Sequence, residues 1–352
     1  MAGISRSTAG IGAFGLACFA AGAALGLGAE RLVVNRTFRY DPDAGEAYGQ
    51  LRAEEHRLVV PDGTGLHVEV DTPEGFRPGI DPTLIFAHGF CCNSDCWYYQ
   101  RRDLAGLGRI VVYDQRSHGR SDRAPNGTHT IDQLGHDLRA VMDDTAPEGP
   151  VILIGHSMGG MTVMAFAMHF PELIGSRVKG VGLLSTSAGG LDTVTFGLPR
   201  PARALMRRYL ADAAALAAAQ QPLVDPARHR ATDLSQILTK IYAFGGWSSA
   251  SMTAFVNQMV ADTPIDVIVE YLPAVMEHDK LEHIDVLQRI PTLVMVGDHD
   301  LMTPTSHSEE ILRRVPEAEF IVMPASGHMA ILERHATVNL RLRHMVQRAL
   351  AE

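Results

Sequence analysis

The chain has 352 residues, 46% of them hydrophobic, and a formal net charge of −9. A chain of this length and composition can bury one large core and still carry an inserted subdomain, so it is not expected to be disordered. The sequence holds no long cluster of Lys and Arg. This excludes the basic surface that proteins use to bind the phosphate backbone of nucleic acids.

An apolar segment without any charged residue runs from residue 7 to residue 29. A segment of this length can cross a bilayer, and its many glycines are common in membrane helices. Three outcomes stay open: an uncleaved signal anchor, a secretory signal cleaved near Gly28 and Ala29, or an Ala/Gly-rich helix that packs on the body of the protein. We expect residues 1–30 to form a signal anchor or signal peptide.

The N-terminal segment also predicts where the protein is found. We expect a transmembrane helix or an export signal, hence a membrane-anchored or exported protein that associates with the membrane through this segment. Basic residues lie on both sides of the segment, so the side of the membrane cannot be read from the sequence. Residues 31–55 are polar and mixed in charge, which is typical of a linker.

The four cysteines predict neither a disulfide framework nor a zinc site. Cys18 lies in the apolar segment, whereas Cys91, Cys92 and Cys96 lie close together after a predicted strand. A structural zinc site needs two pairs of Cys or His ligands, and Cys92 with Cys96 offers one pair. We expect free thiols in buried or loop positions, and neither a metal nor a cofactor.

The body of the chain begins with a predicted β-hairpin. Residues 56–60 and 66–70 alternate between apolar and polar side chains, and a turn-forming stretch rich in Gly separates them. Six short apolar runs follow, each typical of a strand buried on both faces. They are residues 83–87, 109–113, 151–154, 181–184, 292–296 and 320–323.

Helical patterns alternate with these strands, for example in residues 130–144 and 158–169. The alternation predicts an α/β fold with a mostly parallel, doubly wound sheet. Residues 187–288 contain no convincing strand, and their amphipathic pattern predicts a helical cap over the carboxyl ends of the strands. The core is then residues 56–186 and 289–352.

The sharpest motif is Gly155-x-Ser157-x-Gly159, which joins a predicted buried strand to a predicted helix. This is the context of a nucleophile elbow, in which the turn is so tight that side chains at the glycine positions would collide with the neighbouring backbone. The serine hydroxyl then projects into the cleft. We predict Ser157 as a catalytic nucleophile.

A serine hydroxyl needs a base, and the base needs a third group that fixes its tautomer. His328 follows the last predicted strand and is the predicted base. The loop after residues 292–296 offers Asp298 and Asp300. We prefer Asp300 as the catalytic acid, because Asp298 directly follows Gly297, where a carboxylate commonly stabilises a turn.

Acyl chemistry also needs N–H donors for the oxyanion of its tetrahedral intermediate. The residue after the nucleophile, Met158, and Phe90 in the loop after residues 83–87 are the predicted donors. His88 lies beside this site. We interpret it as a residue that braces the loop and contacts substrate, and not as a second base.

The motifs HGF, YDQRSHGRSD, GHSMGG, GDHDLMTP and SGHM occur in this order between residues 56 and 350. In this the chain resembles the α/β-hydrolase-fold superfamily, in its serine esterase, lipase and peroxidase-like branch. The resemblance implies hydrolysis of carboxylic esters, although members of the superfamily also cleave C–C bonds, hydrolyse epoxides or form peracids. Relatives that cleave epoxides and haloalkanes have Asp where this chain has Ser157.

The substrate pocket is predicted from aromatic and sulfur-containing side chains. Beside His88, we expect Trp97 with the three clustered cysteines to form one wall, and Phe244, Trp247 and Phe255 of the cap to bind an apolar group. An ordinary helical core explains the cap residues equally well. The substrate is predicted to be a small acyl ester with an apolar moiety. A C–C bond or thioester hydrolase and a non-catalytic binding protein stay as alternatives.

Overall fold

The computed structural model describes residues 41–191, 194 and 232–351. Residues 41–46 and Ser249–Ser251 belong to a small unit of their own, in which Asp41 accepts hydrogen bonds from the backbone N–H and the hydroxyl of Ser251 at 2.9 and 2.7 Å. The remaining described residues, from Ala47 onward, form the unit that carries the sheet. The fold described below is that of this larger unit.

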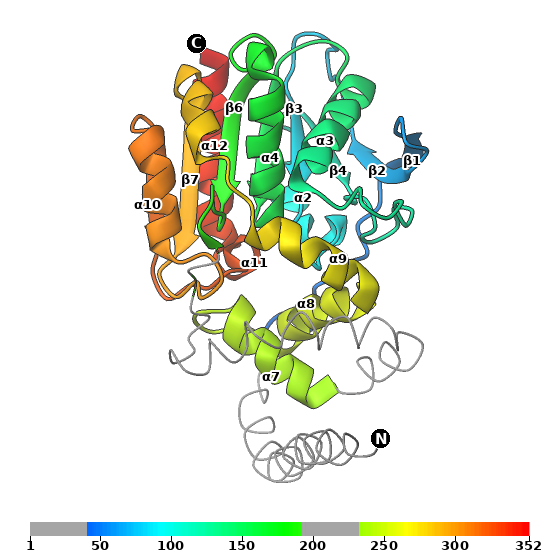
Figure 1. Ribbon diagram of the computed structural model, residues 1–352, viewed down its shortest axis with the longest axis vertical. Helices are drawn as coiled ribbons and strands as arrows, with labels where there is room; N and C mark the ends of the chain where they lie inside the picture. The colour runs from blue at the N-terminus through cyan, green and yellow to red at the C-terminus, as the bar shows by residue number, and fades with distance from the viewer. Residues whose placement is uncertain (1–40, 192–193, 195–231, 352) are drawn as a thin grey trace, which may run out of the picture. The chain divides into compact units, whose positions relative to one another are not determined.

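Eight strands form one sheet in the order β1-β2-β4-β3-β5-β6-β7-β8 (Figure 1). Strand β2 pairs antiparallel with β1 and with β4, and every other neighbouring pair is parallel. The strands are β1 Glu54–Val59, β2 Gly65–Asp71, β3 Thr83–Ala87, β4 Arg109–Tyr113, β5 Val151–His156, β6 Val178–Leu184, β7 Thr292–Gly297 and β8 Glu319–Met323. The predicted hairpin and all six predicted parallel strands are confirmed, with bounds that shift by up to three residues.

The central strands read as continuous apolar runs because both faces of the sheet are covered. Alternate residues of β3 belong to different cores: Leu84 and Phe86 pack on one face, and Ile85 on the other. Helix α12 packs on the first face through Leu342, and α4 packs on the second through Phe166. The doubly wound α/β architecture is therefore confirmed.

Along the chain, helices alternate with strands, as predicted from the sequence. The described helices are η1 Ser94–Trp97, α2 Tyr98–Asp103, α3 Ile131–Thr145, α4 Met158–His169, η2 Pro171–Leu173, α7 Thr232–Ala243, α8 Ala250–Asp262, α9 Ile265–Met276, η4 Leu281–Arg289, α10 Thr305–Arg314, α11 Ala330–Glu333 and α12 His335–Ala351. Helix α3 begins at Ile131 because the Thr130 side chain accepts a hydrogen bond from the N–H of Gln133 at 3.1 Å, which caps the first turn.

Helices α7, α8 and α9 lie beyond the end of the sheet toward which the strand arrows of β6 and β7 point (Figure 1). Helix α9 is tied to the loop after β4, since Arg123 forms ion pairs with Asp266 at 2.9 Å and Glu270 at 2.6 Å. Between β6 and β7 the structure describes residues 185–191, 194 and 232–291, and none of these forms a strand. The cap boundaries at residues 187 and 288 stay a prediction.

The predicted transmembrane helix needs a correction. Within residues 41–191, 194 and 232–351, no helix is both long and apolar enough to span a bilayer. The predicted segment, residues 7–29, lies outside the described residues. The structure therefore gives no support to membrane association.

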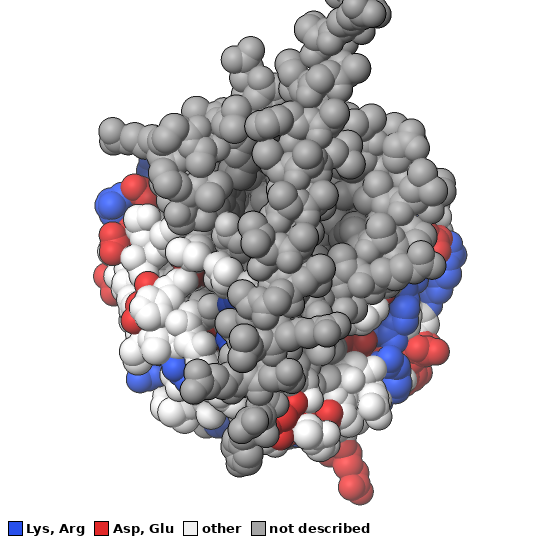
Figure 2. All heavy atoms as spheres, turned by 90° about the horizontal axis from the view of Figure 1, so that it is seen from below, with Lys and Arg blue, Asp and Glu red and all other residues white. Residues whose placement is uncertain are grey.

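On the face shown in Figure 2, the described residues carry basic and acidic side chains close to one another.

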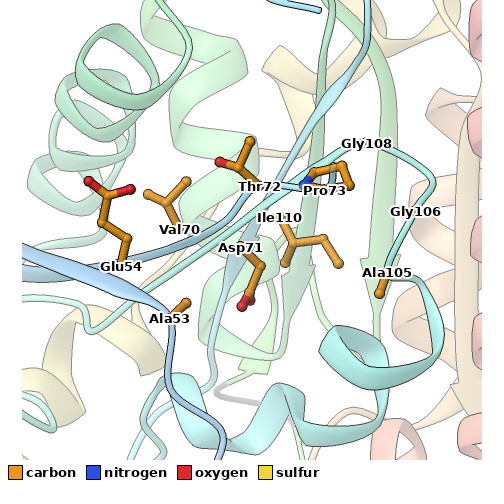
Figure 3. A pocket seen from close by; sticks show the side chains of 10 residues that line it. All are labelled: Ala53, Glu54, Val70, Asp71, Thr72, Pro73, Ala105, Gly106, Gly108 and Ile110. Carbon is orange, nitrogen blue, oxygen red and sulfur yellow. The ribbon is translucent and has the colours of Figure 1, made fainter. Parts of the chain in front are cut away.

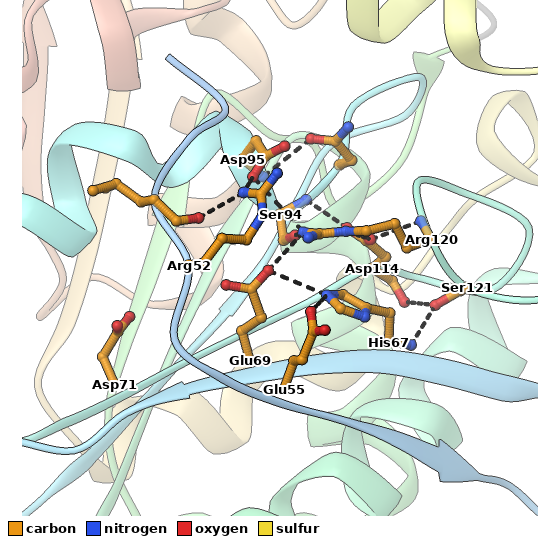
Figure 4. Close-up of polar contacts among 12 residues, drawn as sticks. Arg52, Glu55, His67, Glu69, Asp71, Ser94, Asp95, Asp114, Arg120 and Ser121 are labelled. Carbon is orange, nitrogen blue, oxygen red and sulfur yellow. Dashed lines mark hydrogen bonds and ion pairs between the residues drawn. The ribbon is translucent and has the colours of Figure 1, made fainter. Parts of the chain in front are cut away.

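A buried carboxylate organises the edge of the sheet around β2. Glu69 is fully buried and forms an ion pair with Arg101 at 2.9 Å. It also forms an ion pair with Arg120 at 2.8 Å and a hydrogen bond with His67 at 3.1 Å (Figure 4). Burial by itself would raise the pKa of Glu69, but His67 and the two guanidinium groups lower it to about 2. The carboxylate is therefore charged in the folded protein at neutral pH.

We expect Glu69→Gln to lower the free energy of unfolding at pH 7 by roughly 1–3 kcal/mol, because it removes the charged partner that Glu69 offers to two guanidinium groups, while Arg101 keeps Asp71 and Arg120 keeps Asp114. The pKa of Glu69 is lower in the folded than in the unfolded state, so its contribution is complete above about pH 4.5 and is lost as the pH falls toward about 2. Urea unfolding between pH 7 and pH 3 measures both effects.

Glu55→Gln is the matched control, because Glu55 lies on the neighbouring strand with its side chain 61% exposed, 3.9 Å from the same histidine. It should change stability by less than about 0.5 kcal/mol, as most surface substitutions do. Equal losses in the two variants would contradict a stabilising role for the buried carboxylate.

Candidate active site

Ser157 occupies the turn between β5 and α4 in a conformation that is rare for a residue with a side chain, with φ 54° and ψ −120°. Such a backbone persists only where its surroundings hold it. Here the Ser157 N–H donates to the Leu184 carbonyl of β6 at 3.0 Å, and the Ser157 carbonyl accepts from the Thr186 hydroxyl at 2.7 Å. Strand β6 and the residues just after it thus hold both the N–H and the carbonyl of Ser157 in place.

The two glycines of the motif are required by space. A Cβ atom on Gly155 would lie 2.3 Å from the Gly159 carbonyl oxygen, and a Cβ atom on Gly159 would lie 1.9 Å from the carbonyl oxygen of Ala87. Both distances are far below van der Waals contact. The collision predicted from the sequence is confirmed.

Three side chains that are remote in sequence form one hydrogen-bonded chain. The Nε2 atom of His328 lies 2.8 Å from the Ser157 hydroxyl, and its Nδ1 atom lies 2.9 Å from Oδ2 of Asp300 and 3.1 Å from Oδ1. Ser157 follows β5, His328 follows β8 and Asp300 follows β7. Because parallel strands end at the same edge of a sheet, the topology brings the three together.

Asp300 is held by the loop as well as by the imidazole. It is 4% exposed, and it accepts hydrogen bonds from the N–H groups of Met302 and Thr303 and from the Thr303 hydroxyl, each at 2.9 Å. Burial would raise the pKa of Asp300, but His328 and Thr303 together bring it below its usual value. An ionised carboxylate at Nδ1 keeps the proton on that nitrogen, which leaves Nε2 free to accept the serine proton.

Asp298 has a different environment. Its side chain is 38% exposed, and it accepts a hydrogen bond from the N–H of Ser326 at 3.2 Å. It therefore connects the loops after β7 and β8 and does not contact the imidazole of His328. The geometry favours Asp300, the residue preferred from the sequence.

The two predicted oxyanion donors have free N–H groups beside the serine. In the part of the chain that the structure describes, neither the N–H of Phe90 nor that of Met158 donates to another residue. Met158 is the first residue of α4. Next to Phe90, a Cβ atom on Gly89 would lie 3.1 Å from the Ser157 Cβ, so the loop with Phe90 passes directly beside the hydroxyl.

Sequence reasoning missed His156, which immediately precedes the serine. Its buried ring donates a hydrogen bond from Nε2 to the carbonyl of His328 at 2.9 Å. Burial, reinforced by the neighbouring His328, lowers the pKa of His156 to about 3, so the ring is neutral at neutral pH. It positions the loop that carries His328. Nothing in the motif itself indicates this contact, because the pattern leaves that position open.

A pocket of about 510 Å³ opens onto Ser157 and His328. Among the described residues that line it, none is Lys, Arg, Asp or Glu. Apolar and thiol side chains form much of the wall: Phe90, Cys91, Cys92, Leu238, Val256 and Met302. An uncharged, largely apolar ligand fits such a lining.

The side chains predicted to bind substrate lie elsewhere. His88 is fully buried, where it donates from Nδ1 to the Gly89 carbonyl at 2.8 Å and accepts from the Gln115 N–H at 2.9 Å. It braces the loop and is not part of the pocket lining. Trp97 is also fully buried and packs on Phe86, with 5.0 Å between ring centroids.

The three aromatic residues of the cap are also outside the described lining. Phe244 is buried in the hydrophobic core, Trp247 is 54% exposed, and Phe255 stacks on Tyr48 with ring centroids 5.0 Å apart. For Phe244 and Phe255, the structure agrees with the alternative of an ordinary packed core. A run of apolar residues in a helical segment does not tell which of them face a pocket.

A second cavity, of about 410 Å³, lies at the other end of β4 (Figure 3). Its wall includes Asp71 of β2, Gly108 just before β4, and Ile110. No His, Cys or Ser is among the described residues that line it. It therefore lacks a nucleophile paired with a base, and the pocket at Ser157 is the candidate active site.

A family model described as the alpha/beta hydrolase fold matches residues 82–335. The chain belongs to this family. It is 26% identical over 273 residues to RutD of Caulobacter sp. (strain K31), a protein provisionally named a carbamate hydrolase, and the match covers 75% of this chain and 89% of RutD.

Solved structures of this family have the same fold. The esterase EaEST from Exiguobacterium antarcticum superimposes with a TM-score of 0.66 at 19% identity, over 84% of this chain and 100% of the esterase. The enol-lactonase from Burkholderia xenovorans LB400 gives 0.65 at 21% identity, over 83% of this chain and 100% of the lactonase. The predicted α/β-hydrolase fold is confirmed, and the chain is a hydrolase-like member of the family.

The geometry predicts unequal roles for the two aspartates. Asp300→Asn should slow the reaction of Ser157 with a fluorophosphonate by roughly 10⁴-fold, the loss typical when an amide replaces the carboxylate that holds the imidazole tautomer. Asp298→Asn, a matched change on the same loop, should react at close to the rate of the unchanged protein. Second-order labelling rates measure both, and a larger loss in the Asp298 variant would reverse the assignment.

Proposed function

We propose that the protein is a serine hydrolase that cleaves carboxylic esters with an apolar moiety through a covalent acyl-enzyme. The observation that carries this proposal is the hydrogen bond of 2.8 Å between the Ser157 hydroxyl and Nε2 of His328, with Asp300 on the opposite nitrogen. A nucleophile, a base and an orienting carboxylate in contact are the requirements of acyl transfer.

In the proposed reaction, Ser157 Oγ attacks the acyl carbon while Nε2 of His328 takes the hydroxyl proton. The negative charge that develops on the carbonyl oxygen is met by the N–H groups of Phe90 and Met158. Collapse of the tetrahedral intermediate breaks the ester C–O bond, and His328 gives its proton to the departing alcohol. Water then attacks the acyl-enzyme with His328 as base, which releases the acid and restores Ser157.

The pocket supports an uncharged ester as the substrate. Its described lining carries no Lys, Arg, Asp or Glu that could pair with a charged group, and a charge moved into an apolar pocket without a partner is costly. The names of the relatives, esterase and enol-lactonase, describe proteins that act on open and cyclic esters. They support ester cleavage as the reaction class.

We expect Ser157→Ala to lower kcat for p-nitrophenyl butyrate by at least about 10⁴-fold, because it removes the hydroxyl that lies 2.8 Å from Nε2 of His328 and is activated by it. The variant should also lose labelling by a fluorophosphonate. Esterase assays and mass spectrometry of the labelled peptide measure the two effects. A parallel assay with butyryl thioesters and a C–C substrate separates ester hydrolysis from the alternative chemistries on the same triad.

Ser187→Ala is the matched control, because Ser187 is a second buried serine beside a histidine, 2.8 Å from Nδ1 of His307. Its hydroxyl donates to the Gly189 carbonyl, which is the role of a structural serine. This variant should keep both turnover and labelling. Labelling that persists in the Ser157 variant would refute the proposal, and full binding of esters without any turnover would favour a non-catalytic binding protein.

A further inference from the structure

Several polar side chains interrupt the apolar wall of the pocket at Ser157, and two of them contact each other. Thr239 of α7 and Asn257 of α8 both line this pocket, and the Thr239 hydroxyl donates a hydrogen bond to Oδ1 of Asn257 at 3.2 Å. Asn257 is 8% exposed. The contact joins two helices and fixes the direction of the amide, because the carbonyl oxygen is turned toward Thr239.

The orientation of the amide leaves its NH₂ group as a donor. The hydrogen bond from Thr239 is the one contact that the described part of the chain gives to the Asn257 side chain, so neither proton of Nδ2 is used there. Among the described residues, Nδ2 of Asn257 is not one of the fully buried polar atoms that lack a partner, so it is open to the pocket. A ligand bound in the pocket can therefore offer it an acceptor in place of water.

The chemistry of that acceptor follows from the rest of the wall. No basic or acidic side chain lies among the described lining residues, and the flanking Val256 offers only apolar contact. A neutral amide N–H pairs well with a carbonyl, ether or hydroxyl oxygen. The scissile carbonyl is not this acceptor, because its oxygen has the N–H groups of Phe90 and Met158 beside Ser157.

We propose that Asn257 selects uncharged esters that carry a second oxygen acceptor, separate from the scissile ester group, on an otherwise apolar chain. The inference rests on the proposed function and makes it more specific. Thr239 is the positioning residue, because it holds the side-chain amide of Asn257 so that Nδ2, and not Oδ1, is available to donate to the ligand. The hydrogen bond forms equally in the bound substrate and in the transition state, so it acts on KM more than on kcat.

The test compares ester pairs in which one methylene group is replaced by a ketone. One series moves the ketone along the acyl chain of p-nitrophenyl octanoate, and the other moves it along the alcohol chain of octyl butyrate, with acid release followed by titration. The quantity measured is the ratio of kcat/KM for each ketone to that for its parent. For at least one ketone position, this ratio should fall by about 3- to 10-fold in Asn257→Leu, mainly through KM, as expected for one neutral hydrogen bond.

Thr239→Val should lower the same ratio by less, because the amide stays in place but can rotate. Val256→Ala is the matched control: it enlarges the pocket next to Asn257 without removing a hydrogen-bonding group, so it should leave the ketone preference unchanged while it shifts the preferred chain length. Thermal unfolding of each variant shows that the fold is kept.

Two results would overturn the inference. If the ratio is the same in the unchanged protein and in Asn257→Leu at every ketone position of both series, ester hydrolysis stands but Asn257 does not select the substrate. If the unchanged protein hydrolyses none of the esters and Ser157 is not labelled by a fluorophosphonate, the proposed function fails and the inference fails with it.

Discussion

The whole site depends on the lack of space at the turn between β5 and α4. The backbone of Ala87 in β3 lies so near Gly159 that a single added carbon atom would meet it at 1.9 Å. This close packing forces the chain to turn at Ser157 with a positive φ and lifts the hydroxyl above the edge of the sheet. Gly89 also lies close to Ser157, so the proposed nucleophile and the loop with its proposed oxyanion donor Phe90 are positioned by the same tight packing.

Electrostatics then distinguishes groups that share this buried edge. Asp300 accepts three hydrogen bonds from its own loop in addition to the imidazole, so it stays ionised although burial opposes its charge. His156 has one carbonyl partner and no carboxylate, so burial keeps it neutral. Asp300 can therefore orient the imidazole of His328 by its charge, whereas His156 holds His328 by a hydrogen bond to its backbone carbonyl. Proximity to Ser157 alone does not decide the role of a histidine.

Sequence reasoning predicted the sheet and proposed Ser157, Asp300 and His328, which the fold brings into contact, and the reasons are local. Apolar runs mark strands buried on both faces, and chain order along parallel strands brings the loops after β5, β7 and β8 to one edge. The pocket wall was not predictable in this way. Trp97 and Phe244 look like ligand contacts by composition, yet both are buried in the core, and the pocket lining includes the less conspicuous Thr239 and Asn257.

This difference has a physical origin that bears on specificity within the family. The residues proposed to be catalytic are set by backbone constraints at strand ends, so their positions follow from the order of the strands. Which residues of α7 and α8 face the pocket depends on the rotation of each helix about its own axis. A shift by one residue rotates the helix by about 100°, which can replace a polar group in the pocket wall by an apolar one. A contact such as that between Thr239 and Asn257 fixes this rotation and at the same time presents a donor to the ligand. Selectivity can thus change through the helices while the reaction at Ser157 is preserved.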